Sequence, residues 1–238
     1  MTADLSARAV DARELMDDPD ADPSMLERTY ERFALINAVV SRWRAVYRRD
    51  IRPRARKRSL RVLDVGAGGG DVSRALADWS RRDGVAVEVT ALDADERAIR
   101  WARSRGGAVE YRCAYTSELV DAGETFDMVI SNHLLHHLSD GELGVVMQDS
   151  VALINEDGLV IHRDIARSGF AYRGFAGATL PFARNLLAGS FIRPDGLASI
   201  RRAYTPAELS AVVPRGWQVR TGFPARLELR YEGADDGS

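Results

Sequence analysis

The sequence predicts an α/β protein whose seven strands form a doubly wound, mostly parallel sheet. Two observations carry this prediction. Short apolar runs alternate along the chain with helical patterns, as they do where helices connect parallel strands. The first apolar run ends in Asp64 and a glycine-dense turn, directly before a helical pattern. The 238 residues, of which 45% are apolar, suffice for one such domain with appendages.

The expected elements follow in alternating order. Five core strands are expected over residues 61–65, 86–92, 109–113, 126–131 and 158–165. Connecting helices are expected over residues 71–82, 95–105 and 139–153. The last of these helices begins with a capping box of Ser139 and Glu142. Two further alternating runs, 217–221 and 225–231, predict a terminal antiparallel strand pair.

Changes in pattern divide the chain into four parts. These are an N-terminal helical extension (1–57), the core (58–166), a helical lid insertion (167–202), and a C-terminal helix and strand pair that complete the core (203–238). The acidic residues 1–23, broken by Pro19 and Pro23, are expected to be frayed or loosely docked. Residues 48–58 are expected to be a solvated helix end and linker. The lid is rich in phenylalanine and leucine, which favours covering a small molecule, with a dimer contact as the alternative.

The composition indicates which partners and which cellular compartment to expect for this protein. The net charge of -2 gives no general attraction to nucleic acid. One cysteine, Cys113, excludes an intramolecular disulfide and favours a reducing compartment. The first residues lack the pattern of a signal peptide, and no long apolar run suits a membrane span. A cytoplasmic protein without stable membrane insertion is therefore expected.

The glycine-dense turn favours one kind of nucleotide ligand over another. A strand that runs into such a turn at a helix N-terminus binds anions or nucleotides. Gly66, Gly68 and Gly70 are present, but a dinucleotide fingerprint would place its third glycine at the position of Asp71. Asp93 ends the next strand, where an acid grips ribose hydroxyls. The compact turn favours a methionine-bearing nucleoside, which has no pyrophosphate.

These segments resemble the class I S-adenosylmethionine-dependent methyltransferases. The resemblance depends on the order and spacing of residues 63–70, Asp93, and residues 125–132 and 134–138. Residues 201–209 are similar to the C-terminal region of small-molecule members, including quinone-biosynthesis enzymes. The family often has an acid after the third strand that binds the adenine amino group, and this chain has none there. Adenine recognition is therefore expected from backbone groups and apolar packing.

The resemblance implies S-adenosylmethionine as cofactor, with a Rossmann-like methyltransferase fold. Its contacts are expected from Asp64, Gly66, Gly68, Gly70, Asp93 and Asn132. The glycines bring the backbone close to the cofactor, and Asp64 orders the turn and the ammonium end. Asp93 holds the ribose, and Asn132 faces the methionine moiety.

Histidines gather where a methyl acceptor would lie. His133, His136 and His137 follow the fourth strand, and Asp164 ends the fifth, so all four are expected at the ligand-binding edge of the sheet. Histidine suits proton removal from a phenol or enol. We expect His137 first as base, then His136, with His133 and Asp164 behind. Packing or loop ordering is the alternative for the histidines, and no metal site is expected.

The sequence thus predicts an O-methyltransferase for a small aromatic or polyketide-like metabolite. C-methylation of a quinone-like ring is a close alternative. A nicotinamide-dependent oxidoreductase and a non-catalytic cofactor-binding module are further alternatives. A homodimer is a further expectation.

Overall fold

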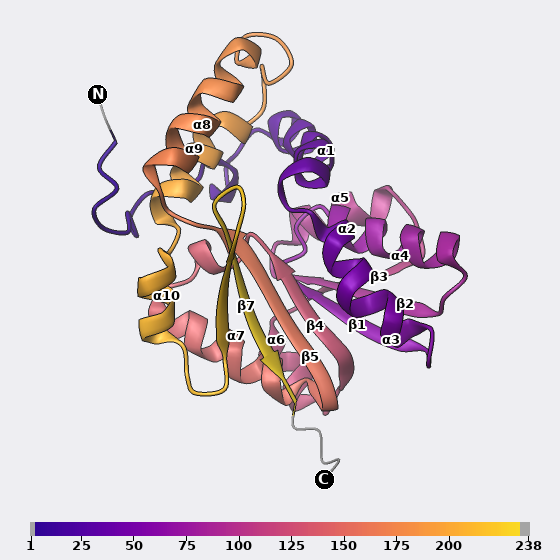
Figure 1. Cartoon of the computed structure of the whole chain (residues 1–238). Helices are drawn as coiled ribbons and strands as arrows, with labels where there is room; N and C mark the ends of the chain where they lie inside the picture. The colour runs from indigo at the N-terminus through magenta and orange to yellow at the C-terminus, as the bar shows by residue number, and fades with distance from the viewer. Residues whose placement is uncertain (1–2, 234–238) are drawn as a thin grey trace.

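A seven-stranded sheet forms the centre of the computed structural model, which describes residues 3–233, with the side chains of 34–40 left aside (Figure 1). Its order is β3-β2-β1-β4-β5-β7-β6. The strands are β1 (Leu60–Val65), β2 (Val87–Asp93), β3 (Val109–Cys113), β4 (Phe126–Asn132), β5 (Ile154–Ile165), β6 (Gln218–Gly222) and β7 (Arg226–Glu232). Strands β1 to β5 pair in parallel, and β7 lies antiparallel between β5 and β6. The predicted mixed sheet and its terminal pair are confirmed.

Helices cover both faces of the sheet, as a doubly wound fold requires. One face carries α2 (Trp43–Val46), α3 (Arg52–Ala55), α4 (Asp71–Asp83) and α5 (Glu96–Ser104). The other carries α6 (Thr116–Asp121), α7 (Asp140–Ala152) and α10 (Pro206–Val212). The capping box of Ser139 and Glu142 begins α7 as predicted. The sequence analysis missed α6, a helix of six residues that is too short to show a period.

The segment after α1 (Pro23–Val40) packs more closely than predicted. Residues 48–58 were expected to be solvated, but the chain makes a π-helical turn over Tyr47–Ile51 and enters α3. Ile51 is fully buried, and Asp50 accepts a hydrogen bond from Arg230 on β7. Part of this charged segment is therefore buried, because β7 supplies partners for its charges. The number of charged residues in the segment does not reveal such partners.

The N-terminal strap, residues 3–22, is another departure from expectation. The prediction of a frayed segment is wrong for its middle part, because Glu14 is buried and Leu15–Asp17 form a 3-10 helix. Arg8 donates to the Arg202 carbonyl and its guanidinium lies 3.5 Å from the Tyr204 ring centroid. The strap is therefore held by contacts with residues far along the chain.

The lid segment stands over the carboxyl ends of the parallel strands (Figure 1). It contains α8 (Gly169–Thr179), a 3-10 turn at Leu180–Phe182, and α9 (Ile192–Arg202). Across the part of the chain that the structure describes, no helix combines the length and apolar character needed to cross a membrane.

Candidate functional site

A cavity of about 440 Å³ lies at the carboxyl ends of β1, β2 and β4. Its walls come from the glycine turn, the strand ends, the strap and helices α8 and α9. The predicted residues Asp64, Gly66, Gly68, Asp93, Asn132, His133, His136 and His137 all line it. Gly70 and Asp164 do not line the cavity themselves, but Gly70 follows the lining residue Gly69 and Asp164 contacts the lining residue His136. One continuous space therefore joins the predicted cofactor residues to the predicted reaction centre.

The glycine turn needs glycine for two different reasons. Gly66, Gly68 and Gly70 all have positive φ angles of 63°, 52° and 69°. A Cβ on Gly70 would lie 2.7 Å from the Tyr111 ring, whereas one on Gly68 would meet no protein atom within 4 Å. The turn is thus packed at its helix end and open at Gly68, where a ligand can approach the backbone.

Asp93 links the turn to the end of β2. Its two carboxylate oxygens accept the Gly68 N–H at 2.7 Å and the Asp95 N–H at 2.9 Å. Burial raises the pKa of Asp93 from its ordinary value, against these two hydrogen bonds. Asp95 caps α5 as the N-cap residue, so Asp93 keeps its position on the cavity wall.

Asp64 is the most deeply buried acid of the cofactor side. It is 1% exposed and accepts a hydrogen bond of 2.5 Å from the Ser73 hydroxyl on α4. Burial raises its pKa to about 7, helped by the negative charges of Asp71 and Asp93. A cationic ligand group beside Asp64 would therefore stabilise the ionised carboxylate.

Three residues after β3 line the region expected for adenine. Ala114, Tyr115 and Thr116 lie on the cavity wall, together with Leu92 and Ala98. None of these side chains is an acid, and recognition of adenine by backbone and apolar contacts stays a prediction.

Asp164 and His136 form a buried ion pair at the cavity wall. Asp164 accepts the His136 backbone N–H at 2.8 Å, and its other oxygen lies 2.8 Å from His136 Nδ1. Burial would lower the pKa of His136, but the charge and hydrogen bond of Asp164 and the nearby Glu14 carboxylate raise it to about 10. The histidines in turn hold the pKa of Asp164 well below its usual range, although burial opposes this. His136 is thus a cation at neutral pH, which cannot accept a proton.

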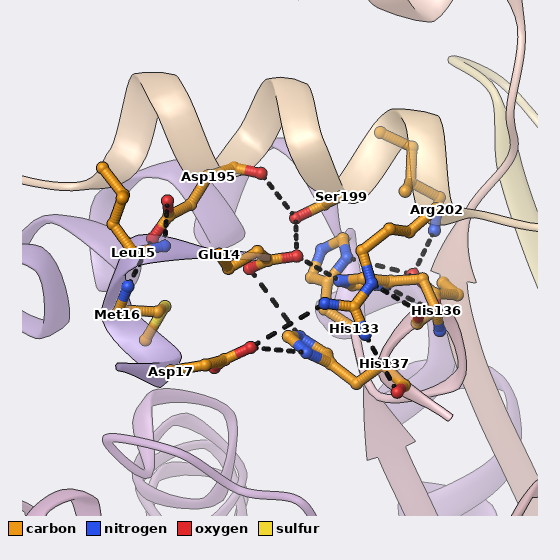
Figure 2. Close-up of polar contacts among 12 residues, drawn as sticks. Glu14, Leu15, Met16, Asp17, His133, His136, His137, Asp195, Ser199 and Arg202 are labelled. Carbon is orange, nitrogen blue, oxygen red and sulfur yellow. Dashed lines mark hydrogen bonds and ion pairs between the residues drawn. The ribbon is translucent and has the colours of Figure 1, made fainter. Parts of the chain in front are cut away.

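His137 lies between two acids of the strap, as Figure 2 shows. Its Nδ1 lies 3.3 Å from Asp17, and its Nε2 lies 3.9 Å from Glu14. The Glu14 carboxylate also lies 3.4 Å from His136 Nε2 and accepts the Ser199 hydroxyl of α9 at 2.8 Å. Burial would raise the pKa of Glu14, but the nearby His136 and His137 and the hydrogen bond from Ser199 lower it to about 2.

His133 occupies a different position from the other two histidines. It follows β4 with a φ angle of 59°, which turns the chain sharply at the cavity mouth. Its Nδ1 lies 3.5 Å from Asp164, and its side chain is about one-third exposed. His133 can therefore meet a ligand in the cavity while Asp164 orients its ring.

The fourth histidine is structural. His162 on β5 is fully buried between the hydroxyls of Ser131 and Ser150. Burial lowers its pKa to about 4, so the ring is neutral. It is absent from the cavity wall.

Sequence reasoning missed the contribution of the strap and of α9. Glu14 and Asp17 line the cavity, and Asp195 on α9 accepts the N–H groups of Leu15 and Met16. The one signal in the sequence was the pair Leu15-Met16, apolar residues inside an acidic segment. Two apolar residues are too few to define a period, so the docking could not be predicted.

Comparison with known proteins agrees with this geometry. Residues 62–158 match a family model described as "Methyltransferase domain". A ubiquinone biosynthesis O-methyltransferase of Azorhizobium caulinodans is 30% identical over 173 residues, which are 68% of this chain and 59% of the relative. One of Rhizobium leguminosarum is 34% identical over 113 residues, which are 46% of this chain and 42% of the relative. The chain thus spans about half the length of the curated relatives it matches.

Solved structures of low sequence identity share the fold over most of the chain. The plantazolicin methyltransferase BpumL, in complex with a triazolic desmethylPZN analog and SAH, has a TM-score of 0.61 at 12% identity. That match covers 94% of this chain and 95% of BpumL. Magnesium protoporphyrin IX methyltransferase (ChlM) from Synechocystis PCC 6803, with bound SAH, has a TM-score of 0.51 at 15% identity and covers 87% of this chain and 83% of that one.

Residues 62–158 are a methyltransferase domain. Its fold and glycine turn are similar to those of the class I S-adenosylmethionine-dependent methyltransferases. The chain is similar to ubiquinone biosynthesis O-methyltransferases over part of their length.

Proposed function

We propose that this protein transfers a methyl group from S-adenosylmethionine to a hydroxyl of a small, flat, largely apolar molecule. The observation that carries the proposal is the single cavity that runs from Gly68 and Asp93 to His133 and His137. Methyl transfer requires the donor and acceptor to meet in line with water excluded. A cavity with cofactor residues at one end and titratable groups at the other supplies that arrangement.

The cofactor end matches the chemistry of the donor. Asp93 offers carboxylate oxygens to ribose hydroxyls, and Asp64 offers a carboxylate to the ammonium group. Gly68 lets the ligand approach the backbone because nothing fills the space beside its Cα. Asn132, at the end of β4, supplies a polar contact for the methionine moiety.

The acceptor end is apolar apart from its histidines and acids. Met16, Phe33, Phe175, Ile192 and Ile200 line the cavity. These side chains suit an aromatic or quinone-like ring. The ubiquinone biosynthesis O-methyltransferases among the relatives support O-methylation of such a ring. C-methylation of the same kind of ring is the second candidate, because the cavity would hold it equally well.

We assign the base to His133, ahead of His137, His136 and Asp164. His136 is already protonated between two carboxylates, and both nitrogens of His137 face acids of the strap. His133 pairs with Asp164 through Nδ1, which leaves Nε2 for the acceptor. In the step, the acceptor hydroxyl gives its proton to His133, and its oxygen attacks the methyl carbon. The carbon–sulfur bond breaks with its electron pair on sulfur, which yields S-adenosylhomocysteine.

The proposal is tested first by cofactor choice. S-adenosylhomocysteine should raise the melting temperature of the protein, because a ligand at a hundred times its Kd stabilises by about 2.7 kcal/mol. NAD at the same concentration should have no effect. A shift with NAD and none with S-adenosylhomocysteine would favour an oxidoreductase and overturn the assignment. Mass spectrometry of a panel of phenols and quinols, incubated with protein and S-adenosylmethionine, then identifies the acceptor class. A homodimer and a cytoplasmic location stay predictions.

A further inference from the structure

Two neighbouring histidines each have Nδ1 beside an aspartate and Nε2 directed toward Glu14. His136 Nδ1 lies 2.8 Å from Asp164, and His137 Nδ1 lies 3.3 Å from Asp17. On their other side, the two Nε2 atoms lie 3.4 Å and 3.9 Å from the two oxygens of Glu14. Figure 2 shows the Glu14 carboxylate facing both rings from the strap. In each ring, the contact of Nδ1 with its aspartate is therefore shorter than the contact of Nε2 with Glu14.

The contacts on the Glu14 side are too long for hydrogen bonds, which span about 2.7–3.2 Å between nitrogen and oxygen. His136 Nε2 is buried, and it has no hydrogen-bond partner within the described residues. Two ligand atoms that each lie about 2.1 Å from one metal ion are separated by about 3–4.2 Å, depending on the angle between them. The 3.4 Å and 3.9 Å separations fall in this range.

We propose that Glu14, His136 and His137 bind one divalent first-row transition metal ion, with Zn²⁺ as the reference ion. Their three ligand atoms lie within 4.8 Å of one another. Two imidazoles and one carboxylate form a donor set for Zn²⁺ or Fe²⁺ that leaves coordination positions open. Glu14 and His137 both line the cavity, so a ligand can reach those open positions.

The surroundings of the site fit a cation. Metal-binding histidines usually donate the N–H of their other nitrogen to a carboxylate, which fixes the ring. Asp164 and Asp17 stand in that place for His136 and His137. Glu14, Asp17 and Asp164 place three carboxylates around the two imidazoles, and the guanidinium of Arg202 lies 3.9 Å from Asp17. A divalent ion at this position adds two positive charges beside these carboxylates.

A second group of possible ligands overlaps the first and is less suitable. His133, His136 and Asp164 also offer atoms within reach of one ion. There, however, the Asp164 oxygen is already 2.8 Å from His136 Nδ1, which is a hydrogen bond. The Glu14 side has no such bond to displace.

The role of the ion rests on the proposed function. A divalent ion held by Glu14, His136 and His137 would act as a Lewis acid toward an acceptor hydroxyl and would lower the pKa of that hydroxyl. His133 would accept the proton that the hydroxyl loses. The expectation of no metal site came from ligand spacing in the sequence, and Glu14 is too distant from the histidines in the chain to be found that way.

The test is titration of the metal-stripped full chain with Zn²⁺ alone, against a chromophoric chelator. The expected result is one ion per chain. Glu14→Gln and His137→Gln should each weaken binding by more than about 100-fold, because a lost ligand exceeds the 10–100-fold effect of a lost supporting partner. Ser199→Ala is the matched control, since it removes only the hydroxyl that donates to Glu14. Its Zn²⁺ affinity should fall by no more than about 10–100-fold, which is less than the loss in either ligand variant. No saturable binding, or unchanged affinity in both ligand variants, overturns the proposal.

Two further readouts do not depend on activity. Zn²⁺ should slow trypsin cleavage after the exposed Arg13, because the ion ties Glu14 of the strap to the loop after β4. Unchanged cleavage at saturating Zn²⁺ would count against Glu14 as a ligand. Calorimetry with S-adenosylhomocysteine separates the two proposals. If S-adenosylhomocysteine binds and Zn²⁺ does not, the proposed methyltransferase function stands and the proposed metal site is wrong. If Zn²⁺ binds and S-adenosylhomocysteine does not, the metal site stands and the methyltransferase function is wrong.

Discussion

The two ends of the cavity are built in different ways. The cofactor end comes from consecutive segments: β1, the glycine turn and α4, followed by the end of β2. The acceptor end combines the strap, the loop after β4, and helices α8 and α9, which are far apart in the chain. A site built from neighbouring residues keeps its geometry once its strand and helix form. A site built from distant segments depends on their docking, and each docking contact is a place where it can be changed.

The largest effect is expected at the cofactor end, from Gly68→Val. Residue 68 has a φ of 52° and open space beside it, so the valine side chain would project into the ligand position. Cofactor affinity should fall by at least about 100-fold, since the backbone can no longer approach the ligand. Calorimetry with S-adenosylhomocysteine measures this loss.

The matched control for this substitution is Gly84→Val. Gly84 ends α4 with a φ of 65°, and a Cβ there would also meet no atom within 4 Å, but it is outside the cavity wall. Both variants should lose about 1–2 kcal/mol of stability from the left-handed conformation. Equal cofactor affinity in the two variants would show that the open space at Gly68 is not the ligand site.

At the acceptor end, His133→Ala should lower turnover by about 10²–10⁴-fold, the usual contribution of one positioned base. Cofactor affinity should stay near that of wild type, because the glycine turn and Asp93 are unchanged. Turnover is measured against pH with the acceptor that the panel identifies. Near-normal turnover in His133→Ala would return the role of base to His137. Near-normal turnover in the alanine variants of all four candidates would show that no side-chain base is needed, and that the enzyme acts only by positioning the acceptor against the methyl group.

Docking of the strap can be weakened without touching the proposed base. Asp195→Ala removes the carboxylate that accepts the N–H groups of Leu15 and Met16. The two unpaired N–H groups should destabilise the docked strap by about 1–3 kcal/mol each where they stay buried. We expect faster trypsin cleavage after Arg13 and weaker acceptor binding, with cofactor affinity nearly unchanged. Loss of cofactor affinity as large as the loss of acceptor affinity would contradict the separation of the two ends.

The same contrast explains what could be predicted from the sequence. The sheet, the glycine turn and Asp93 follow from local rules: periodicity, capping and the residues that a turn tolerates. The positions of His133, His136 and His137 near Asp164 also followed, because parallel strands end at one edge. Their different environments did not follow. They depend on Glu14 and Asp17, whose docking requires Asp195 and Ser199 of α9, and no local pattern connects residues so far apart in the chain.

The smallest effect concerns the proton on Asp64, at the cofactor end. Burial raises the pKa of this carboxyl to about 7 in the folded protein, above the value of about 3.9 for an unfolded aspartate. Its protonation therefore stabilises the fold fully below about pH 4, and this contribution is lost as the pH rises through 7. Asp71 and Asp93 also raise this pKa by their charge, while Ser73 lowers it. A cofactor with ammonium and sulfonium cations favours the ionised form, so its binding near pH 6 should release up to one proton. Calorimetry in buffers of different ionisation enthalpy measures that release, which should vanish near pH 8. Asp64→Asn should bind without releasing this proton at either pH, and an unchanged release in that variant would assign the proton to another group.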